Sequence, residues 1–300
     1  MAETVYLESF EDTEVLLSKL SQPVRDWFKD KFPDFTDPQK MAIPSIIEGE
    51  HLLLCSPTGS GKTLTAFLTI IDKLVRLAVD GKLEKQVYCV SISPIKALAN
   101  DIQRNLIGPL TEIKERFLPG RAQEIKVGLR TGDTPQSERQ KMLRNPPHIL
   151  ITTPESLGLA LASKKFRPLM NDLQWLIIDE MHSLVPTKRG THLALTMALL
   201  DTLIANPVQR LGISATMEPL EEVAHFLVPV KAEDREVETD APIPVFDDEE
   251  SSVVHIAKVS EVRELDLDII LPHPKFSEVP VKQLLDHNVD IIKDLSLIHI

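Results

Sequence analysis

Short apolar runs alternate with amphipathic segments along the first 230 residues of this 300-residue chain. The runs are rich in Val, Ile and Leu, which is typical of strands buried on both faces. They lie at residues 52–55, 86–92, 126–129, 148–152, 175–178 and 210–213. Segments of helical period stand between them, so the pattern predicts an α/β fold in which helices cover both faces of a parallel sheet.

The clearest predicted helix follows the first run. It carries its apolar residues at helical spacing, at Leu64, Phe67, Leu68, Ile71, Leu74, Val75 and Ala78. Further helices are predicted at 95–106, after Thr153-Pro154, at 191–203 and at 219–226. Residues 1–30 are predicted to form a lead-in of short helices before the main domain.

Charge and composition divide the chain near residue 230. Residues 231–300 hold 17 acidic and 7 basic residues, so 1–230 carries only −2 of the net charge of −12. We therefore predict a main domain at 31–230, an acidic linker at 231–252 and the beginning of a second domain at 253–300. The second part is predicted to have strands at 253–259 and 265–271 and a helix at 281–295. The overall acidity does not exclude a nucleic-acid partner, because backbone N–H groups and a few local side chains can bind phosphate.

Targeting and redox signals are weak. The N-terminus is acidic and resembles no secretory signal, and no apolar run approaches the length of a membrane span. Cys55 and Cys89 both lie in predicted buried strands and form no C-x-x-C pair. We expect a cytoplasmic protein with no membrane association and no disulfide.

A glycine-rich turn joins the first strand to the first long helix. Its sequence is Ser56-Pro57-Thr58-Gly59-Ser60-Gly61-Lys62-Thr63. Gly59 and Gly61 would let backbone N–H groups approach a phosphate, Lys62 would reach the β/γ-phosphates, and Thr63 would hold Mg²⁺. The strict P-loop pattern has glycine at the position of Ser56, and the alternative is an ordinary turn with an exposed lysine.

Two acidic residues end the run at 175–178. Asp179 would hold Mg²⁺ while Glu180 orients or deprotonates a water molecule, which supplies the second half of an NTPase site. His182 is either part of this site or a structural histidine. The run at 210–213 ends in Ser214-Ala215-Thr216, whose hydroxyls would sense the γ-phosphate or belong to an ordinary turn.

Other polar residues also lie near predicted strand ends. Ser93-Pro94 and Thr153-Pro154 each open a helix, which is either routine capping or part of a surface that follows a phosphate backbone. Arg130 either meets phosphate or is solvated in its loop, and the same two alternatives hold for Lys188-Arg189-Gly190. Gln39 has the donors and the acceptor needed to read an adenine edge.

Five ordered segments resemble the first RecA-like domain of superfamily 2 DExH helicases, and most of all the Lhr, or large helicase-related, group. The segments are FTDPQKMAIPSIIEGEHLLLCSPTGSGKT, SISPIKALANDIQRNL, VGLRTGDTPQSERQKMLRNPPHILITTPESL, IIDEMHSLVPTKRGTHLAL and QRLGISATMEPLEEVAHFL. Together they cover about residues 30–230. The resemblance implies ATP and Mg²⁺ as cofactors and a single-stranded or partly duplex nucleic acid as partner, with DNA favoured over RNA.

The resemblance also assigns roles by position. It implies adenine reading by Gln39 and ATP binding by Thr58, Gly59, Ser60, Gly61, Lys62 and Thr63. It implies catalysis by Lys62, Asp179, Glu180 and His182, metal binding by Thr63 and Asp179, and coupling by Ser214 and Thr216. The implied nucleic-acid contacts are Pro94, Lys96, Arg130, Thr131, Gly132, Thr153, Pro154 and Glu155.

Helicases of this group translocate 3′ to 5′ and use a second RecA-like domain that supplies arginine fingers. Residues 253–300 resemble only the opening of such a domain, so we expect a fragment with weak ATPase activity. The ending at 295–300, LSLIHI, matches the translation of a common sequencing adapter, which suggests an incomplete gene. The alternative function is a non-catalytic nucleic-acid-binding module that ATP switches.

Overall fold

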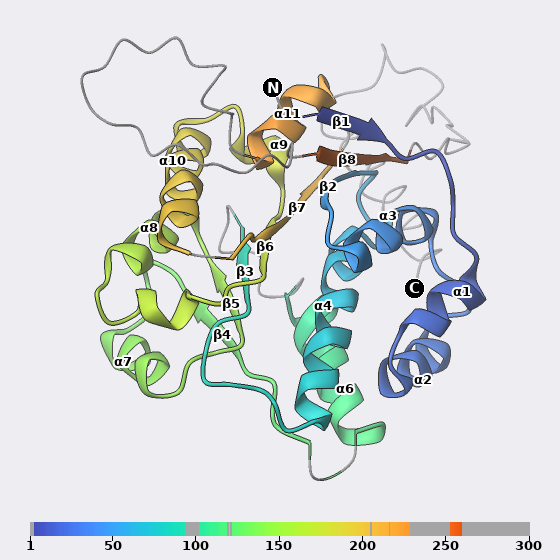
Figure 1. Cartoon of the computed structure of the whole chain (residues 1–300), viewed down its shortest axis with the longest axis horizontal. Helices are drawn as coiled ribbons and strands as arrows, with labels where there is room; N and C mark the ends of the chain where they lie inside the picture. Colours follow the sequence, from blue (N-terminus) through green and yellow to red (C-terminus); the bar gives the residue numbers. More distant parts are fainter. Residues whose placement is uncertain are drawn as a thin grey trace, which may run out of the picture. The chain divides into compact units, whose positions relative to one another are not determined.

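The computed structural model describes residues 3–93, 102–118, 120, 122–204, 206–215, 217–228 and 253–259. Eight strands of this part form one sheet in the order β1-β8-β2-β7-β6-β3-β5-β4, and every neighbouring pair is parallel. The strands are β1 (Glu3–Tyr6), β2 (His51–Cys55), β3 (Cys89–Ile92), β4 (Val127–Arg130), β5 (Ile149–Thr152), β6 (Trp175–Ile178), β7 (Gln209–Ser214) and β8 (Val253–Lys258). The predicted α/β class is confirmed (Figure 1).

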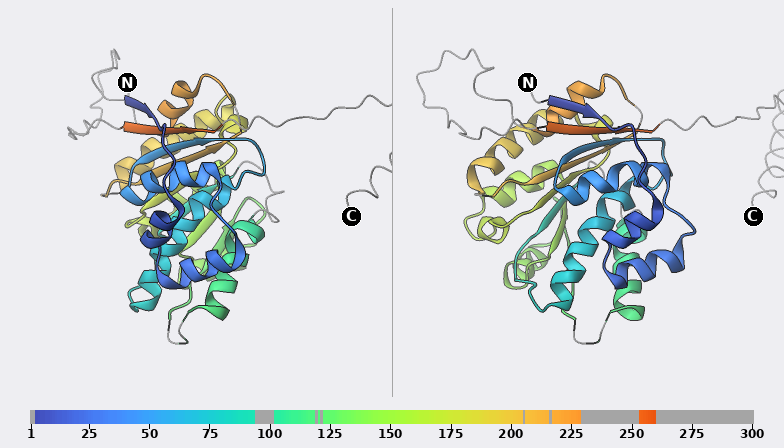
Figure 2. Two further views of the ribbon diagram at one scale, coloured as in Figure 1. Left: turned by 90° about the vertical axis from the view of Figure 1, so that its right-hand side faces the viewer. Right: turned by 45° about the vertical axis from the view of Figure 1, so that its right-hand side comes forward.

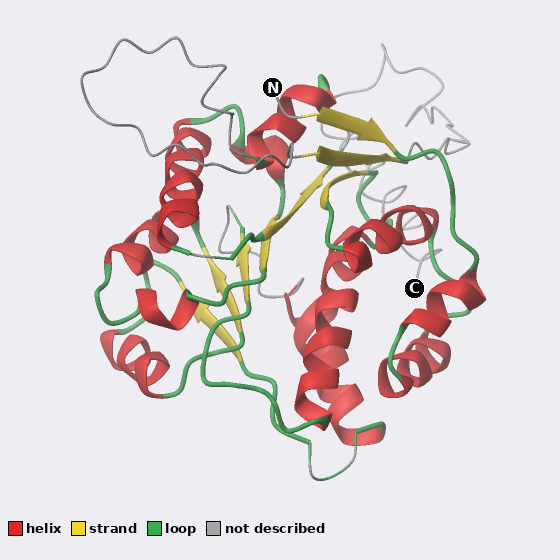
Figure 3. Ribbon diagram, in the orientation of Figure 1, coloured by secondary structure: helices red, strands yellow, loops and turns green. Residues whose placement is uncertain are grey.

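Helices cover both faces of the sheet (Figure 3). One face packs against α3 (Asp37–Glu48), α4 (Lys62–Val79) and α6 (Gly108–Arg116), with η2 (Gln103–Ile107) just before α6. The other packs against α8 (Pro154–Ala162), α9 (Met181–Leu184), α10 (Lys188–Leu203) and α11 (Leu220–Leu227), with η3 (Arg167–Met170) after α8. Strand side chains alternate between the two layers, as Leu52 and Leu54 face α4 while Leu53 and Cys55 face α11. The short α7 (Gln136–Arg144) follows β4.

The N-terminal lead-in is partly helical and belongs to the same unit. Helices α1 (Thr13–Lys19) and α2 (Gln22–Lys31) match the expectation, and α2 is fastened to α4 through the buried Asp72. The Asp72 carboxylate accepts hydrogen bonds from Ser21 N at 2.6 Å and Arg76 Nε at 2.8 Å. Strand β1 is not predicted from the sequence, because its four residues are mostly exposed and carry no apolar alternation.

Strand β8 corrects the expected domain boundary. The sequence predicts a strand at 253–259 as the opening of a second domain, and the strand is present. It pairs with β2 on one side and β1 on the other, with Leu53 opposite Ile256, so it is part of the first sheet. Burial of Val254, Ile256 and Ala257 explains the placement, since β8 covers apolar surface and pairs the edge that β2 would otherwise expose. The linker at 231–252 and residues 260–300 lie outside the described residues and stay predictions.

The sheet order decides where the loops meet. In a parallel sheet all carboxyl ends lie at one edge, and ligands bind there in open α/β folds. Figure 2 shows helices on both sides of this sheet. The predicted helix at 95–106 is described only from Ile102, and α10 begins at Lys188, three residues before its predicted start.

Candidate functional site

Three adjacent strands bring the predicted catalytic segments together. β7 lies between β2 and β6. Cys55 is paired with Ser214, and Ile178 is paired with Gly212. The loop from Ser56, the hydroxyl of Ser214 and the pair Asp179-Glu180 therefore all emerge at the same edge.

The glycine-rich turn has the backbone conformation that its glycines predict. Gly59 and Gly61 have φ of 84° and 88°, a region that side chains other than glycine rarely adopt. A Cβ on Gly61 would lie 3.0 Å from Gln39 Nε2, so this glycine also permits a close approach between the loop and α3. α4 starts at Lys62, so the turn ends directly in a helix N-terminus, where partial positive charge favours an anion.

Lys62 lies inside the loop. Its Nζ donates to the carbonyl oxygens of Ser56 at 2.5 Å and Pro57 at 2.6 Å, and the residue is only 8% exposed. These carbonyl oxygens are the kind of acceptor that phosphate oxygens also provide. The lysine of this turn is therefore not exposed, which contradicts that part of the alternative interpretation.

The non-consensus Ser56 has a defined structural role. It is completely buried, and its Oγ lies 2.6 Å from Ser60 Oγ. Ser60 donates to the Pro57 carbonyl at 2.8 Å, so the Ser56 hydroxyl is the donor of the pair. A serine in place of glycine thus adds a hydrogen bond across the loop.

Gln39 and Thr36 connect α3 to the loop. Gln39 Oε1 accepts from Thr36 N at 2.9 Å, which forms a capping box at the start of α3. Thr36 Oγ1 donates to the Ser60 carbonyl at 3.0 Å. Thr36 was not among the predicted site residues, although the spacing T-x-x-Q signals the capping box in the sequence. The Gln39 amide nitrogen faces the loop and its oxygen caps the helix.

The two acidic residues Asp179 and Glu180 directly follow the last residue of β6. Asp179 is 6% exposed, and its Oδ1 accepts from Glu180 N at 2.9 Å. Glu180 adopts a left-handed conformation with φ 55°, which is rare for a residue other than glycine. Backbone strain of this kind concentrates at functional sites. The turn separates the two carboxylates, so that Asp179 is buried while Glu180 is partly exposed.

His182 bridges Glu180 and the end of β7. Its Nε2 lies 3.0 Å from Glu180 Oε2, and its Nδ1 accepts from Ala215 N at 3.2 Å. Since Nδ1 is an acceptor, Nε2 carries the proton and donates to Glu180. The His182 backbone N–H donates to Ser214 Oγ at 3.2 Å. His182 is thus satisfied by hydrogen bonds, and those bonds join the two segments predicted to act together. Thr216 lies outside the described residues.

The same edge continues over β3, β5 and β4. Ile92 of β3 and Arg130 of β4 both pair with Thr152, so these two strands end on either side of the end of β5. The Arg130 guanidinium stacks 4.4 Å from the Phe166 ring and the residue is 8% exposed, so the alternative of a solvated loop arginine is wrong. Burial lowers the pKa of Arg130. Arg139, which the sequence did not single out, donates to the carbonyls of Thr131 at 3.1 Å and Gly132 at 3.0 Å.

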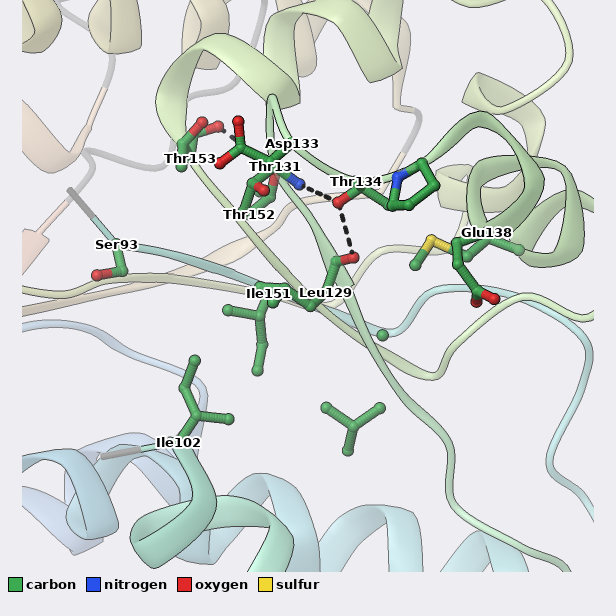
Figure 4. A pocket seen from close by; sticks show the side chains of 14 residues that line it. Ser93, Ile102, Leu129, Thr131, Asp133, Thr134, Glu138, Ile151, Thr152 and Thr153 are labelled. Carbon is green, nitrogen blue, oxygen red and sulfur yellow. Dashed lines mark hydrogen bonds between the residues drawn. The ribbon is translucent and has the colours of Figure 1, made fainter. Parts of the chain in front are cut away.

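A pocket of about 540 Å³ opens beside this loop (Figure 4). Ile102, Leu129 and Ile151 contribute apolar surface to it. The Thr134 hydroxyl at its rim accepts from Thr131 N at 2.8 Å and donates to the Leu129 carbonyl at 3.2 Å. The turn after β4 is therefore fixed by its own hydrogen bonds as well as by Arg139.

The Thr153-Pro154-Glu155 segment starts α8 at the end of β5. Thr153 Oγ1 accepts from Ser156 N at 3.4 Å, and Pro154 is the first helical residue, as predicted. The Glu155 carboxylate receives Arg189 Nε at 2.6 Å and Nη2 at 3.1 Å. This pairing with Arg189 lowers the pKa of Glu155 to about 2. Pro94 and Lys96, the other predicted contacts of this kind, lie outside the described residues.

The structure also bears on the two cysteines and on the expected lack of membrane association. Cys55 and Cys89 are both buried free thiols, as predicted. In the part of the chain that the structure describes, no helix has the length and the apolar character needed to cross a bilayer.

The comparison with known proteins agrees with this geometry. The model of the DEAD/DEAH box helicase family matches residues 36–223, from the capping residue of α3 to α11. The chain belongs to this family. The resemblance to the Lhr group is also confirmed, because the ATP-dependent helicase Lhr-Core of Sulfolobus acidocaldarius is 53% identical over 218 residues, which are 72% of this chain and 24% of that protein. Lhr-Core of Methanocaldococcus jannaschii is 41% identical over 297 residues, or 98% and 33%.

A solved Lhr structure supports the same grouping. The structure of Mycobacterium smegmatis helicase Lhr bound to ssDNA and AMP-PNP has a TM-score of 0.72 and 37% identity, and the match covers 95% of this chain and 33% of that one. The DEAD-box helicase Mss116 bound to ssRNA has a TM-score of 0.66 at 17% identity, a likeness of fold alone. This chain thus spans about a quarter to a third of the length of these two Lhr-Core relatives and of the solved Lhr chain.

Proposed function

We propose that this chain is the ATP-binding part of a nucleic-acid helicase that uses ATP to move 3′ to 5′ along a single strand. The observation that carries the proposal is the convergence of the Lys62 loop, Asp179-Glu180 and Ser214 on three adjacent strand ends. The family match and the Lhr helicase structure with AMP-PNP and ssDNA support it.

The phosphate groups of ATP would bind at the loop and the start of α4. Lys62 would exchange the carbonyls of Ser56 and Pro57 for phosphate oxygens, while Gly59 and Gly61 keep the backbone free for close approach. Because the lysine already has two oxygen partners, ATP replaces existing hydrogen bonds and does not meet a bare charge.

Thr63 and Asp179 fit a magnesium ion bound together with ATP. Mg²⁺ takes one or two protein oxygens and completes its shell with phosphates and waters, so a hydroxyl at the start of α4 and one buried carboxylate at the end of β6 are a suitable set. When bound, the ion would neutralise charge on the β- and γ-phosphates.

Glu180 would act on the attacking water. Its carboxylate is partly exposed, and the hydrogen bond from His182 Nε2 orients it. His182 and Ser214 would transmit changes at the γ-phosphate to β7, because the His182 imidazole contacts both Glu180 and the backbone of Ala215, while the His182 backbone N–H donates to Ser214 Oγ. Gln39 would offer its amide nitrogen, which faces the loop, to the adenine edge.

The nucleic acid would lie along the β3-β5-β4 part of the edge. The turn at Thr131-Gly132 and the start of α8 at Thr153 lie at this edge, and contacts made there to the phosphate backbone would not read sequence. Arg130 would support this surface from beneath through its stacking on Phe166. Pro94 and Lys96 complete the proposed set, and DNA is favoured over RNA.

Nucleic-acid-stimulated ATPase activity tests the proposal. Glu180→Gln should lower kcat about 10²- to 10⁴-fold and retain ATP binding, because it removes the group that handles the water's proton. Lys62→Ala should abolish both binding and turnover. The measurement is phosphate release with and without oligo-dT, by the chain alone and by the chain extended with the downstream region that the relatives contain.

Three results would argue against the proposal. If oligo-dT does not stimulate the ATPase activity even of the extended protein, and Lys62→Ala does not change that activity, the ATP-switched binding module is the better account. An extended protein that unwinds only duplexes with a 5′ overhang would contradict the proposed direction. A chain that binds ATP and no single strand at low salt would be an ATPase of another kind.

A further inference from the structure

Two helices start side by side at the edge proposed for the nucleic acid. α8 follows β5 directly, and α10 follows the short α9 just after Asp179-Glu180. Both N-termini are capped by threonine, since Thr153 Oγ1 accepts from Ser156 N and Thr187 Oγ1 accepts from Gly190 N. The helices stay in contact beyond their first turns, where a Cβ on Gly158 would lie 3.2 Å from the His192 ring. Figure 1 shows α8 and α10 next to each other on one face of the sheet.

The second residue of each helix carries a charge, and the two charges are opposite. Glu155 is second in α8 and Arg189 is second in α10. An anion is favourable at a helix N-terminus and a cation is not, so the helix dipole alone accounts for Glu155 and disfavours Arg189. The forked pairing at 2.6 and 3.1 Å gives Arg189 a compensating partner.

The backbone places the guanidinium where it reaches Glu155. A Cβ on Gly190 would lie 2.4 Å from the Leu184 carbonyl oxygen, so the chain there is pressed against the end of α9. Only glycine fits this close approach. The start of α10, and Arg189 with it, is therefore fixed relative to the segment that carries Glu180.

Folding stability is a weak reason for this pair. The side chain of Glu155 is 49% exposed and that of Arg189 is 39% exposed, and ion pairs with that exposure contribute little to stability. What the pair does change is the charge at the edge. A carboxylate whose pKa is about 2 is ionised at neutral pH, and without a partner it would repel a phosphate backbone beside α8.

We propose that Arg189 is a positioning residue that neutralises Glu155 and holds its carboxylate away from the phosphates of the bound strand. The inference rests on the proposed function, and it changes the role of Glu155 from a contact with nucleic acid to the partner of Arg189. The ligand chemistry is the phosphodiester backbone, which DNA and RNA share.

The test compares single-strand affinities of four variants by fluorescence anisotropy, with oligo-dT and oligo-U measured separately. Arg189→Gln leaves the Glu155 carboxylate unpaired and should weaken binding about fivefold. Glu155→Gln leaves an unpaired cation and should strengthen binding about threefold. The double variant should return to within about twofold of the wild type, and Arg189→Lys, which keeps the charge, should as well.

Controls separate electrostatics from damage to the fold. The differences should shrink as salt rises from about 0.05 to 0.3 M, because screening shortens the range of the charges, whereas a structural defect would persist. A matched exposed pair, Lys114 and Glu124 at 2.7 Å, precedes the start of β4 and so lies toward the opposite edge of the sheet. Lys114→Gln and Glu124→Gln make the same charge changes and should each shift affinity less than twofold.

Several outcomes would overturn the inference. If Glu155→Gln binds the single strand more weakly than the wild type, the Glu155 carboxylate contacts the strand directly. If the double variant binds as weakly as Arg189→Gln, Arg189 contacts the strand directly. An Arg189→Gln variant with wild-type affinity would remove the role altogether. If the wild-type chain binds neither oligonucleotide at low salt, the proposed function fails and this inference falls with it; if it binds and the two signs are not opposite, only the inference fails.

Discussion

At the scale of single residues, the phosphate loop shows how much chemistry a motif contains and what it omits. Lys62, Gly59 and Gly61 were found from their spacing alone, because each is needed for a reason that does not depend on distant parts of the chain. Thr36 and the Ser56 hydroxyl act through partners that only the fold supplies, at Ser60 in both cases. The hydrogen bonds of Arg139 and the pairing of Arg189 with Glu155 were likewise beyond sequence reasoning, since nothing local distinguishes a bonded arginine from a solvated one.

Gly61→Ala gives a prediction at this scale. The substitution forces a left-handed conformation on a residue with a Cβ and presses it against Gln39 Nε2 at 3.0 Å. We expect stability to fall by about 1–2 kcal/mol and ATP affinity to fall more than tenfold, because the loop must shift. Gly81→Ala is the matched control, since φ there is +70° and nothing lies within 4 Å. It should cost similar stability and leave nucleotide affinity unchanged. Equal ATP affinities in the two variants, measured with a fluorescent nucleotide, would refute this account.

At the scale of elements, the positions of the strands along the sequence were easier to predict than which strands pair with each other. Hydrophobic runs identify β2, β3, β5, β6 and β7 because a strand buried on both faces needs an apolar side chain at nearly every position. The run that forms β8 was predicted for the same reason, but its pairing with β2 across about 200 residues of sequence was not. β1 was missed because an edge strand with exposed side chains leaves no pattern. Periodicity reports burial and is silent about pairing.

The position of β8 has a measurable consequence. Ile256 is fully buried in the layer with α11, so Ile256→Ala should lower the free energy of unfolding of the ATP-binding unit by about 2–5 kcal/mol. Both tryptophans, Trp27 and Trp175, are buried in that unit and report its unfolding in urea. The partly buried Val253, changed to Ala, is the control and should have a much smaller effect. Unchanged tryptophan unfolding in Ile256→Ala would mean that β8 does not belong to this sheet.

At the scale of the whole molecule, the sheet keeps its chemistry at one edge and a buried polar cluster at the other. His51 starts β2, and its Nδ1 accepts from Arg210 N at 3.1 Å near the beginning of β7. Arg210 donates to the Leu227 carbonyl at 2.5 Å and pairs with Asp201, which joins β7 to α10 and α11. The far edge is thus fixed by hydrogen bonds with no counterpart in the motifs, which explains why sequence reasoning found only one edge.

Acid should destabilise the protein through this far edge before it reaches the carboxylates. Burial first, and then the neighbouring charges of Arg210 and His255, lower the pKa of His51 to about 4 from an ordinary value near 6.5. The folded state therefore favours the neutral imidazole, and its contribution is complete above pH 6.5 and is lost as pH falls through 4. The difference corresponds to about 3 kcal/mol. Urea unfolding at steps between pH 7 and 4 should show this loss, whereas lowered carboxyl pKa values such as that of Glu155 act mainly below pH 4.5. His51→Asn keeps an acceptor for Arg210 N and has no titratable group, so its stability should vary less over the same window. An unchanged slope in His51→Asn would assign the acid sensitivity to other groups, among which His148 has a pKa lowered by burial as well.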